Sequence, residues 1–181
     1  MNLLKTIRNT DVGLEAPLAP VDIVKVRKAA RAVILMDGKV ALMHATRDRY
    51  FKLPGGGIES SDGPTDTTST IVTALAREAK EEVGAEITVT QEVGKIIEIR
   101  EDEGFQQESF CFIAQQIGEL TEPELTEKEL EAGFELFWAN DINHAIQLVD
   151  DASPENGGGK FMKARDGEFL RSARQLLHLG Q

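Results

Sequence analysis

The sequence predicts an α/β fold in which a mixed sheet is packed between helices. Short apolar segments separated by turn residues fill the front and centre of the chain, one helical segment follows a run of three glycines, and two more helical segments end the chain. With 181 residues the chain is long enough to bury one sizeable core. We therefore expect an N-terminal arm over residues 1–24, where Pro17 and Pro20 discourage a long helix, and a single domain over residues 25–181.

The overall composition narrows the classes of function. No apolar run approaches the roughly 20 residues of a membrane span, and the first residues lack the apolar centre of a signal peptide, so we expect a cytoplasmic protein without membrane association. The net charge of −11 argues against nucleic acid as a partner. The single cysteine, Cys111, excludes an internal disulfide framework and a cysteine zinc site, and its apolar neighbours predict a buried strand thiol.

The first strands lead the chain to the glycine run. Ala29 to Met36 is apolar and ends at Asp37-Gly38, a strong hairpin signal, after which Val40 to His44 returns as a strand. Tyr50 to Leu53 then forms a short strand before Pro54 and the three glycines. A backbone that turns tightly and approaches a ligand closely has no room for a Cβ atom, which explains the glycines.

A helix follows an exposed loop. The segment from Ser60 to Ser69 is rich in Ser, Asp, Thr, Gly and Pro and predicts that loop. Asp66, Thr67 or Thr68 is expected to cap the helix, which runs to Val83 and stops at Gly84.

The helix presents a cluster of carboxylates beside its apolar stripe. At roughly 100° per residue, Glu78, Glu81 and Glu82 fall within an arc of about 100°. Like charges at this spacing destabilise a helix by roughly 0.2–0.5 kcal/mol per pair, and a divalent cation such as Mg²⁺ would remove that cost. The alternative is a solvated acidic face, tempered by Arg77 and Lys80.

The second half of the chain alternates strands, an acidic segment and helices. Its expected elements are one or two strands over Glu86 to Arg100, a return strand over Glu108 to Ile117, an acidic solvated loop over residues 118–132, a strand over Phe134 to Ala139, a helix from an Asn140 or Asp141 cap through Leu148, a flexible break over residues 154–159, and a helix over Phe161 to Leu179.

The stretch from Leu53 to Ala85 resembles a known motif. Arg77-Glu-Ala-x-Glu-Glu-x-Gly-Ala85 matches the second half of the Nudix box, G-x5-E-x7-R-E-U-x-E-E-x-G-U with U apolar, and Leu53-Pro-Gly-Gly-Gly-Ile-Glu59 looks like its usual entry. The resemblance implies the Nudix-type α/β/α sandwich with a mixed, largely antiparallel sheet. The first half departs from the pattern by an insertion of seven residues, which leaves either Asp62 or Ser69 in the place of the first box glutamate.

The resemblance also implies a reaction and its residues. Nudix hydrolases cleave a diphosphate bond in small molecules linked to a nucleoside diphosphate, with Mg²⁺ or Mn²⁺ as cofactor. By position, the metal ligands would be the Gly56 carbonyl oxygen, Glu78, Glu81 and Glu82, and Arg77 would orient the glutamates. The general base would be a helix glutamate or a later carboxylate, with Glu135 preferred and Glu108 as the alternative.

The basic residues suggest where the substrate binds. Residues 1–55 hold ten Lys/Arg against five Asp/Glu, in an otherwise acidic chain. Arg31 and Lys52 are expected to receive phosphate oxygens, and Arg49 and Phe51 are expected to contact the base or sugar. The alternative is that these charges are solvated at the edge of the sheet.

A second class of function stays open. A Nudix-fold module that binds a nucleotide or sugar-phosphate without cleaving it would fit the altered first half of the box, although the retained Arg77 and glutamates favour an enzyme. A diphosphate isomerase would need an active-site cysteine, which Cys111 in an apolar strand does not favour. The sequence leaves the substrate, the number of metal ions and the oligomeric state open, with a homodimer among the alternatives.

Overall fold

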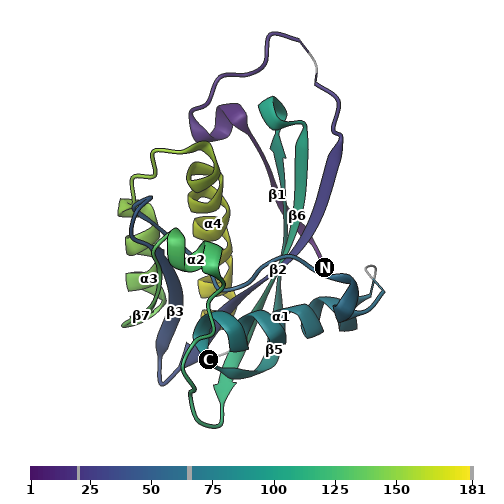
Figure 1. The fold of residues 1–181 in the computed structure, drawn as a ribbon. Helices are drawn as coiled ribbons and strands as arrows, with labels where there is room; N and C mark the ends of the chain where they lie inside the picture. The colour runs from purple at the N-terminus through teal and green to yellow at the C-terminus, as the bar shows by residue number, and fades with distance from the viewer. Residues whose placement is uncertain (20, 65–66, 180–181) are drawn as a thin grey trace.

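A computed structural model describes residues 1–19, 21–64 and 67–179, in which helices cover both faces of one mixed sheet (Figure 1). The strands are β1 (Leu3–Arg8), β2 (Lys25–Met36), β3 (Lys39–Ala45), β4 (Tyr50–Lys52), β5 (Glu86–Arg100), β6 (Phe105–Ile117) and β7 (Phe134–Ala139). The α-helices are α1 (Thr68–Val83), α2 (Glu127–Glu131), α3 (Ile142–Asp151) and α4 (Gly157–Leu179), and the 3-10 helices are η1 (Asn9–Val12), η2 (Ser60–Asp62) and η3 (Glu101–Glu103). The predicted α/β/α sandwich is confirmed.

The sheet runs in the order β1-β5-β6-β2-β3-β4, and β7 also pairs with β3. The pairs β1–β5 and β2–β6 are parallel and the other pairs are antiparallel. Strand β2 is central and is buried throughout Ala29–Ile34 because both of its faces are covered. On one face Ala30, Ala32 and Ile34 pack under α1; on the other Val33 packs with residues of α3 and α4.

The N-terminal arm is part of the sheet. Strand β1 pairs in parallel with β5, and the side chain of Ile7 is fully buried. Asn9 accepts a hydrogen bond from the Glu101 backbone N–H at 3.1 Å and donates one to Asp102 at 2.9 Å. Within the predicted arm, Leu3–Arg8 thus forms a strand that local sequence did not predict, because the pairing that orders it comes from residues far along the chain.

The helix α1 has a side-chain cap at its start and a glycine at its end. The Thr67 side chain accepts from the Thr70 backbone N–H at 3.2 Å, whereas Asp66, another predicted cap, lies outside the described residues. Gly84 ends the helix with φ +68°. The preceding segment was expected to be an exposed loop, but it contains η2 and buries Asp62, because the Asp62 carboxylate accepts hydrogen bonds from α1.

Two predicted irregular segments form helices. The acidic loop over residues 118–132 contains α2, whose N-terminus is closed by reciprocal hydrogen bonds between Thr126 and Glu129. The expected break over residues 154–159 already belongs in part to α4, which begins at Gly157. The Asn156 side chain accepts from the Gly159 N–H at 2.6 Å, and this cap offsets the low helix propensity of the glycines.

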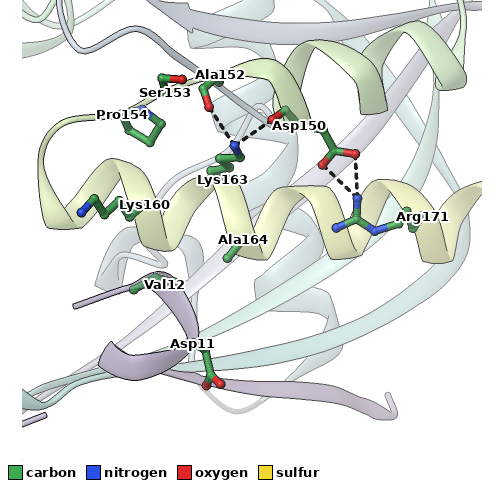
Figure 2. Close-up of a pocket in the computed structure, with 10 residues that line it drawn as sticks. All are labelled: Asp11, Val12, Asp150, Ala152, Ser153, Pro154, Lys160, Lys163, Ala164 and Arg171. Carbon is green, nitrogen blue, oxygen red and sulfur yellow. Dashed lines mark hydrogen bonds and ion pairs between the residues drawn. The ribbon is translucent and has the colours of Figure 1, made fainter. Parts of the chain in front are cut away.

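Residues of α3, α4 and η1, together with the segment between α3 and α4, line a surface hollow of about 410 Å³ (Figure 2). Lys163 donates to the carbonyl oxygens of Asp150 and Ala152 at 2.7 and 2.8 Å, and Arg171 pairs with the Asp150 carboxylate at 3.0 Å. These bonds tie the end of α3 to α4.

Among the described residues, no helix is both long enough and apolar enough to span a bilayer.

The end of α1 generates a stability prediction. A Cβ atom at Gly84 would lie 2.0 Å from the Thr121 carbonyl oxygen, in addition to the strain of its positive φ. We expect Gly84→Ala to lower the free energy of unfolding by about 2–4 kcal/mol in urea denaturation. Gly38→Ala is the matched control, because Gly38 has φ +81° but a Cβ atom there would meet no other atom within 4 Å. It should lower the free energy of unfolding by about 1 kcal/mol. Equal losses in the two variants would contradict the contact argument.

Candidate functional site

A cleft of about 440 Å³ opens beside the glycine loop, Gly55 to Gly57. It is lined by side chains from six elements and from the segment after the loop. These residues are Arg27, Arg31, Tyr50, Lys52, Ile58, Glu59, Glu78, Glu82, Glu129, Phe134 and Met162. Its polar wall carries both signs of charge, with carboxylates from α1 and cations from β2 and β4.

The glycine loop continues the sheet alongside β2. The Gly56 carbonyl oxygen accepts from the Ala30 N–H at 3.0 Å, and the Pro54 carbonyl oxygen accepts from the Ala32 N–H at 3.1 Å. Gly55 has φ +129°, and a Cβ there would lie 2.1 Å from the Ala30 carbonyl oxygen. A Cβ at Gly56 would lie 2.2–2.5 Å from the Glu78 carboxyl group. Glycine is therefore required for α1 and β2 to approach the loop this closely.

Two of the three predicted carboxylates converge on this loop. Glu82 is 1% exposed, and its carboxylate accepts from the Gly55 N–H at 2.6 Å and from the Lys52 ammonium at 2.5 Å. Glu78 is 8% exposed and contacts Gly56; burial raises its pKa, and the negative charge of Glu82 raises it further. Glu81 is half-exposed, pairs with Arg77 at 3.0 Å, and does not line the cleft.

Cations already neutralise these carboxylates. Lys52 is paired with Glu82, and one nitrogen of Arg77 donates to both Glu78, at 2.9 Å, and Glu81. Within residues 1–19, 21–64 and 67–179, no three His, Cys, Asp or Glu side chains stand in a ready-made metal-binding group. The donor set nevertheless suits a hard divalent ion, because Glu78 and Glu82 supply carboxylate oxygens. Such an ion would compete with Lys52 and Arg77 for these oxygens.

Arg77 connects the helix to the inserted segment. Its Nε and Nη2 atoms each donate to the Asp62 carboxylate at 3.1 Å, and Nη2 also donates to the Gly57 carbonyl oxygen at 3.0 Å. Ser69 instead lies at the exposed start of α1, where its hydroxyl contacts Thr67. Of the two alternatives for the first box glutamate, Asp62 is therefore the residue that meets Arg77. The insertion follows Asp62 in the sequence and leaves this contact in place.

Arg31 is a buried cation with unused hydrogen-bonding capacity. Its side chain is 4% exposed, its Nε has no partner, and its Nη1 reaches the Ala30 carbonyl oxygen at 3.4 Å. Burial lowers the pKa of Arg31 to about 10, helped by the positive charge of Arg165. Arg27 lies four residues earlier on the same face of β2 and donates to Gln107 at 3.3 Å. A phosphate oxygen in the cleft would satisfy the Arg31 guanidinium.

A family model for the NUDIX domain matches residues 25–152. The chain belongs to the NUDIX family. The resemblance seen in residues 53–85 is thus confirmed over most of the chain. No curated protein sequence matches this chain.

Solved structures share the NUDIX fold at low sequence identity. The Escherichia coli ORF135 protein is 24% identical with a TM-score of 0.55, over 84% of this chain and 91% of that one. A NUDIX hydrolase from Nitrosomonas europaea is 19% identical with a TM-score of 0.56, over 83% and 90% of the two chains. The Caenorhabditis elegans Ap4A hydrolase is 19% identical with a TM-score of 0.54, over 84% and 98%. At these identities the likeness establishes the fold alone.

The lining of the cleft does not include every predicted site residue. Glu135 is exposed and pairs with His44 on the neighbouring strand β3. Successive side chains on β7 point to opposite faces of the sheet, and Phe134, not Glu135, is the one that lines the cleft. The structure therefore does not place Glu135 in the cleft lining, and its role as the base stays a prediction. The alternative base, Glu108, pairs with Lys95 at 2.5 Å and is also outside the cleft lining.

The two predicted contacts to a base or sugar are also displaced. Phe51 stacks on His44 with ring centroids 4.3 Å apart, on the face of β4 opposite Tyr50 and Lys52. Arg49 has φ +54° and pairs with the exposed side chain of Glu155. Neither residue lines the cleft, and their contacts with a base or sugar stay predictions, whereas the predicted phosphate contacts Arg31 and Lys52 do line it.

Several residues of the cleft wall escaped the sequence reasoning, among them Glu129 and Met162. Glu129 enters from α2, and the Thr126-x-x-Glu129 capping pattern was the local signal that a helix begins there. Met162 enters from α4 without any local signal. Such residues are brought to the site only by the packing of distant elements.

The Asp62–Arg77 contact predicts a pH-dependent contribution to stability. Hydrogen bonds from Arg77 hold the pKa of Asp62 below its ordinary value. The contribution is therefore fully present above roughly pH 4 and is lost as the pH falls through the lower folded-state pKa. We expect Asp62→Asn to lower the free energy of unfolding by about 1–3 kcal/mol at pH 7, with a smaller difference in acid.

Urea denaturation at several pH values measures this effect. Ser69→Ala is the control and should change stability by less than about 0.5 kcal/mol at every pH. A larger loss for Ser69→Ala than for Asp62→Asn would show that Ser69, not Asp62, carries the role of the first box residue.

Proposed function

We propose that this NUDIX domain is a metal-dependent pyrophosphohydrolase that cleaves a diphosphate bond in a small nucleoside-diphosphate-linked molecule. One observation carries the proposal: two buried carboxylates, Glu78 and Glu82, meet at the glycine loop across a cleft from the buried, incompletely paired Arg31. Burying a charge is costly even when it is paired, and a buried cation with unsatisfied donors is costly as well. A divalent ion together with a substrate phosphate would relieve both costs at once.

The metal ion would be Mg²⁺ or Mn²⁺. Glu78 and Glu82 would hold it, joined by Glu81 if that side chain exchanges its partner Arg77 for the ion. Gly56 would contribute the lone pair of its carbonyl oxygen that Ala30 does not use. When bound, such an ion neutralises phosphate charge and activates water for attack on phosphorus.

The cations of β2 and β4 would bind the phosphates. Arg31 offers its unused guanidinium donors, and Arg27 lines the same wall. A guanidinium binds two phosphate oxygens at once, which fixes the orientation of the diphosphate bond. Lys52 would also bind a phosphate oxygen once the ion has replaced it as the partner of Glu82. Arg77 would orient Glu78 through their 2.9 Å bond.

Glu129 replaces Glu135 as our candidate general base. It lines the cleft from α2, and one of its oxygens is held by the Thr126 N–H and hydroxyl, both at 2.8 Å. A positioned base contributes roughly 10²–10⁴-fold to a rate. The apolar side of the cleft, formed by Tyr50, Phe134 and Met162, would receive the base or sugar. The cleft volume of about 440 Å³ is within the usual range for small-molecule sites.

A binding module without hydrolysis is the second candidate. Lys52 already neutralises Glu82 at 2.5 Å, so the cleft could bind a phosphorylated ligand while the carboxylate remains paired with the protein. The two candidates differ in whether product is released in the presence of metal.

Substitution of the cleft carboxylates tests the metal site. We expect Glu82→Gln to reduce metal-dependent kcat by more than tenfold, because its carboxylate is placed against the glycine loop, while circular dichroism shows a retained fold. Glu135→Gln is the control and should leave kcat within about twofold, since Glu135 lies outside the cleft. A Glu82→Gln variant that keeps more than about a tenth of the wild-type kcat would refute the ligand role.

A substrate panel with and without metal separates enzyme from sensor. ADP-ribose, a UDP-sugar, Ap4A and NADH are incubated with Mg²⁺ or Mn²⁺, and released nucleotide is measured by chromatography. We expect release from at least one compound with metal and none with EDTA. Tight binding of a panel member by calorimetry without any release would select the sensor.

A further inference from the structure

A charged pair is completely buried in the middle of α4. Arg165 and Asp166 are both 0% exposed, and Arg165 donates to the Asp166 carboxylate through Nε at 2.6 Å and Nη2 at 3.0 Å. Burying two charges costs several kcal/mol per ion before their attraction is counted, and an apolar pair is often as stable or more stable. The pair lies beyond residues 25–152, the part that matches the NUDIX family. Its further partners indicate what it does.

Asp166 holds the strand that leads into the glycine loop. Its Oδ2 accepts from the Leu53 N–H at 3.0 Å, 113 residues away in the sequence. Two residues later the Gly55 N–H donates to Glu82 of α1 at 2.6 Å. The helices α4 and α1 pack on opposite faces of the sheet. The approach to the glycine loop is thus held from both sides by buried carboxylates, one from each helical layer.

Arg165 connects the same pair to the cation wall of the cleft. Its Nη1 donates to Glu98 of β5 at 2.7 Å, and Glu98 also accepts from Gln107 of β6 at 3.3 Å. The Gln107 side-chain oxygen in turn accepts from Arg27 at 3.3 Å. Glu98 and Gln107 are 0% and 2% exposed. A chain of hydrogen bonds therefore runs from α4 across two strands to a cation that lines the cleft; its bonds from Arg165 and Gln107 to Glu98 are buried, and its last bond, from Arg27, is partly buried.

We propose that Arg165 and Asp166 are positioning residues of the active site, which set the glycine loop through Leu53 and the guanidinium of Arg27 through Glu98 and Gln107. The inference rests on the proposed function for its kinetic consequence. It gives α4 a role in positioning the site, in addition to supplying Met162 to the cleft lining. Without the pair, the buried Leu53 N–H lacks an acceptor, and the loop shifts to find another.

The competing explanation is a pair that only stabilises the packing of α4. The two explanations differ in what a folded variant does. An ion pair that serves packing alone is replaceable by apolar side chains without effect on Leu53 or on turnover. A positioning pair is not, because no apolar side chain accepts a hydrogen bond.

Two variants and one control test the proposal. Asp166→Asn keeps the shape and an acceptor oxygen but removes the charge, and the double variant R165M/D166L removes charge and acceptor together. Arg171→Met is the control, because it breaks an exposed ion pair on the same helix that has no link to the cleft. Each protein is assayed for thermal unfolding, for hydrogen exchange of the Leu53 and Gly55 amides without metal or substrate, for Mn²⁺ affinity, and for kcat and KM.

We expect Leu53 exchange to accelerate about threefold in Asp166→Asn and more than tenfold in R165M/D166L, with kcat falling in the same order. Mn²⁺ affinity should weaken alongside, since Glu82 is held through Gly55. Arg171→Met should change none of these three quantities. The proposal is overturned if R165M/D166L is folded and its Leu53 exchange, Mn²⁺ affinity and kcat stay within twofold of wild type. If the double variant does not fold, the same result for a folded Asp166→Asn overturns it.

The readouts separate this proposal from the proposed function. If the wild-type protein releases product from no substrate, the hydrolase proposal fails, and Leu53 exchange together with Mn²⁺ affinity still decides the role of the pair. If the wild-type protein is active and the variants match it in every readout, only the positioning role fails.

Discussion

The candidate site depends on the close approach of two α1 carboxylates to the glycine loop. Gly56 leaves no room for a Cβ beside Glu78, and the Gly55 N–H donates directly to Glu82. This approach requires α1 to begin and end at defined residues, which the Thr67 cap and the left-handed Gly84 provide. The caps, the glycines and the carboxylates therefore all contribute to this approach.

The cleft retains buried charge that folding alone does not favour. Glu78 is buried beside Glu82, and Arg31 is buried with an unpaired Nε. Groups of this kind cluster at functional sites, where the rest of the structure compensates for their cost. Here the compensation comes from a dense packing on both faces of β2 and from charged partners such as Lys52 and Arg77. A metal ion and a phosphate would bind where Lys52 and Arg77 now neutralise the carboxylates and where Arg31 keeps an unpaired donor.

The insertion in the first half of the box changes the loop without removing the contact that the box needs. Counting forward from Gly56 predicts Asp62 and counting backward from Arg77 predicts Ser69, and only Asp62 bonds to Arg77. The Asp62 side chain is shorter than that of a glutamate, and it still reaches Arg77 because η2 brings it close to α1. Alternation along β7 separates Phe134, which lines the cleft, from Glu135 on the other face.

Local patterns in the sequence by themselves determined the glycine loop, the presence of α1 with its Gly84 end and a cap among Asp66, Thr67 and Thr68, and the presence of carboxylates on one flank of that helix. Each of these depends on residues a few positions apart. Only the tertiary structure decided that β1 joins the sheet, that Glu81 lies outside the cleft, and that Glu129, Met162 and Asp166 reach the site or its support. Their partners lie in distant elements, such as Leu53 and Asp166 at a separation of 113 residues, and the geometry of such contacts exists only after the layers have packed.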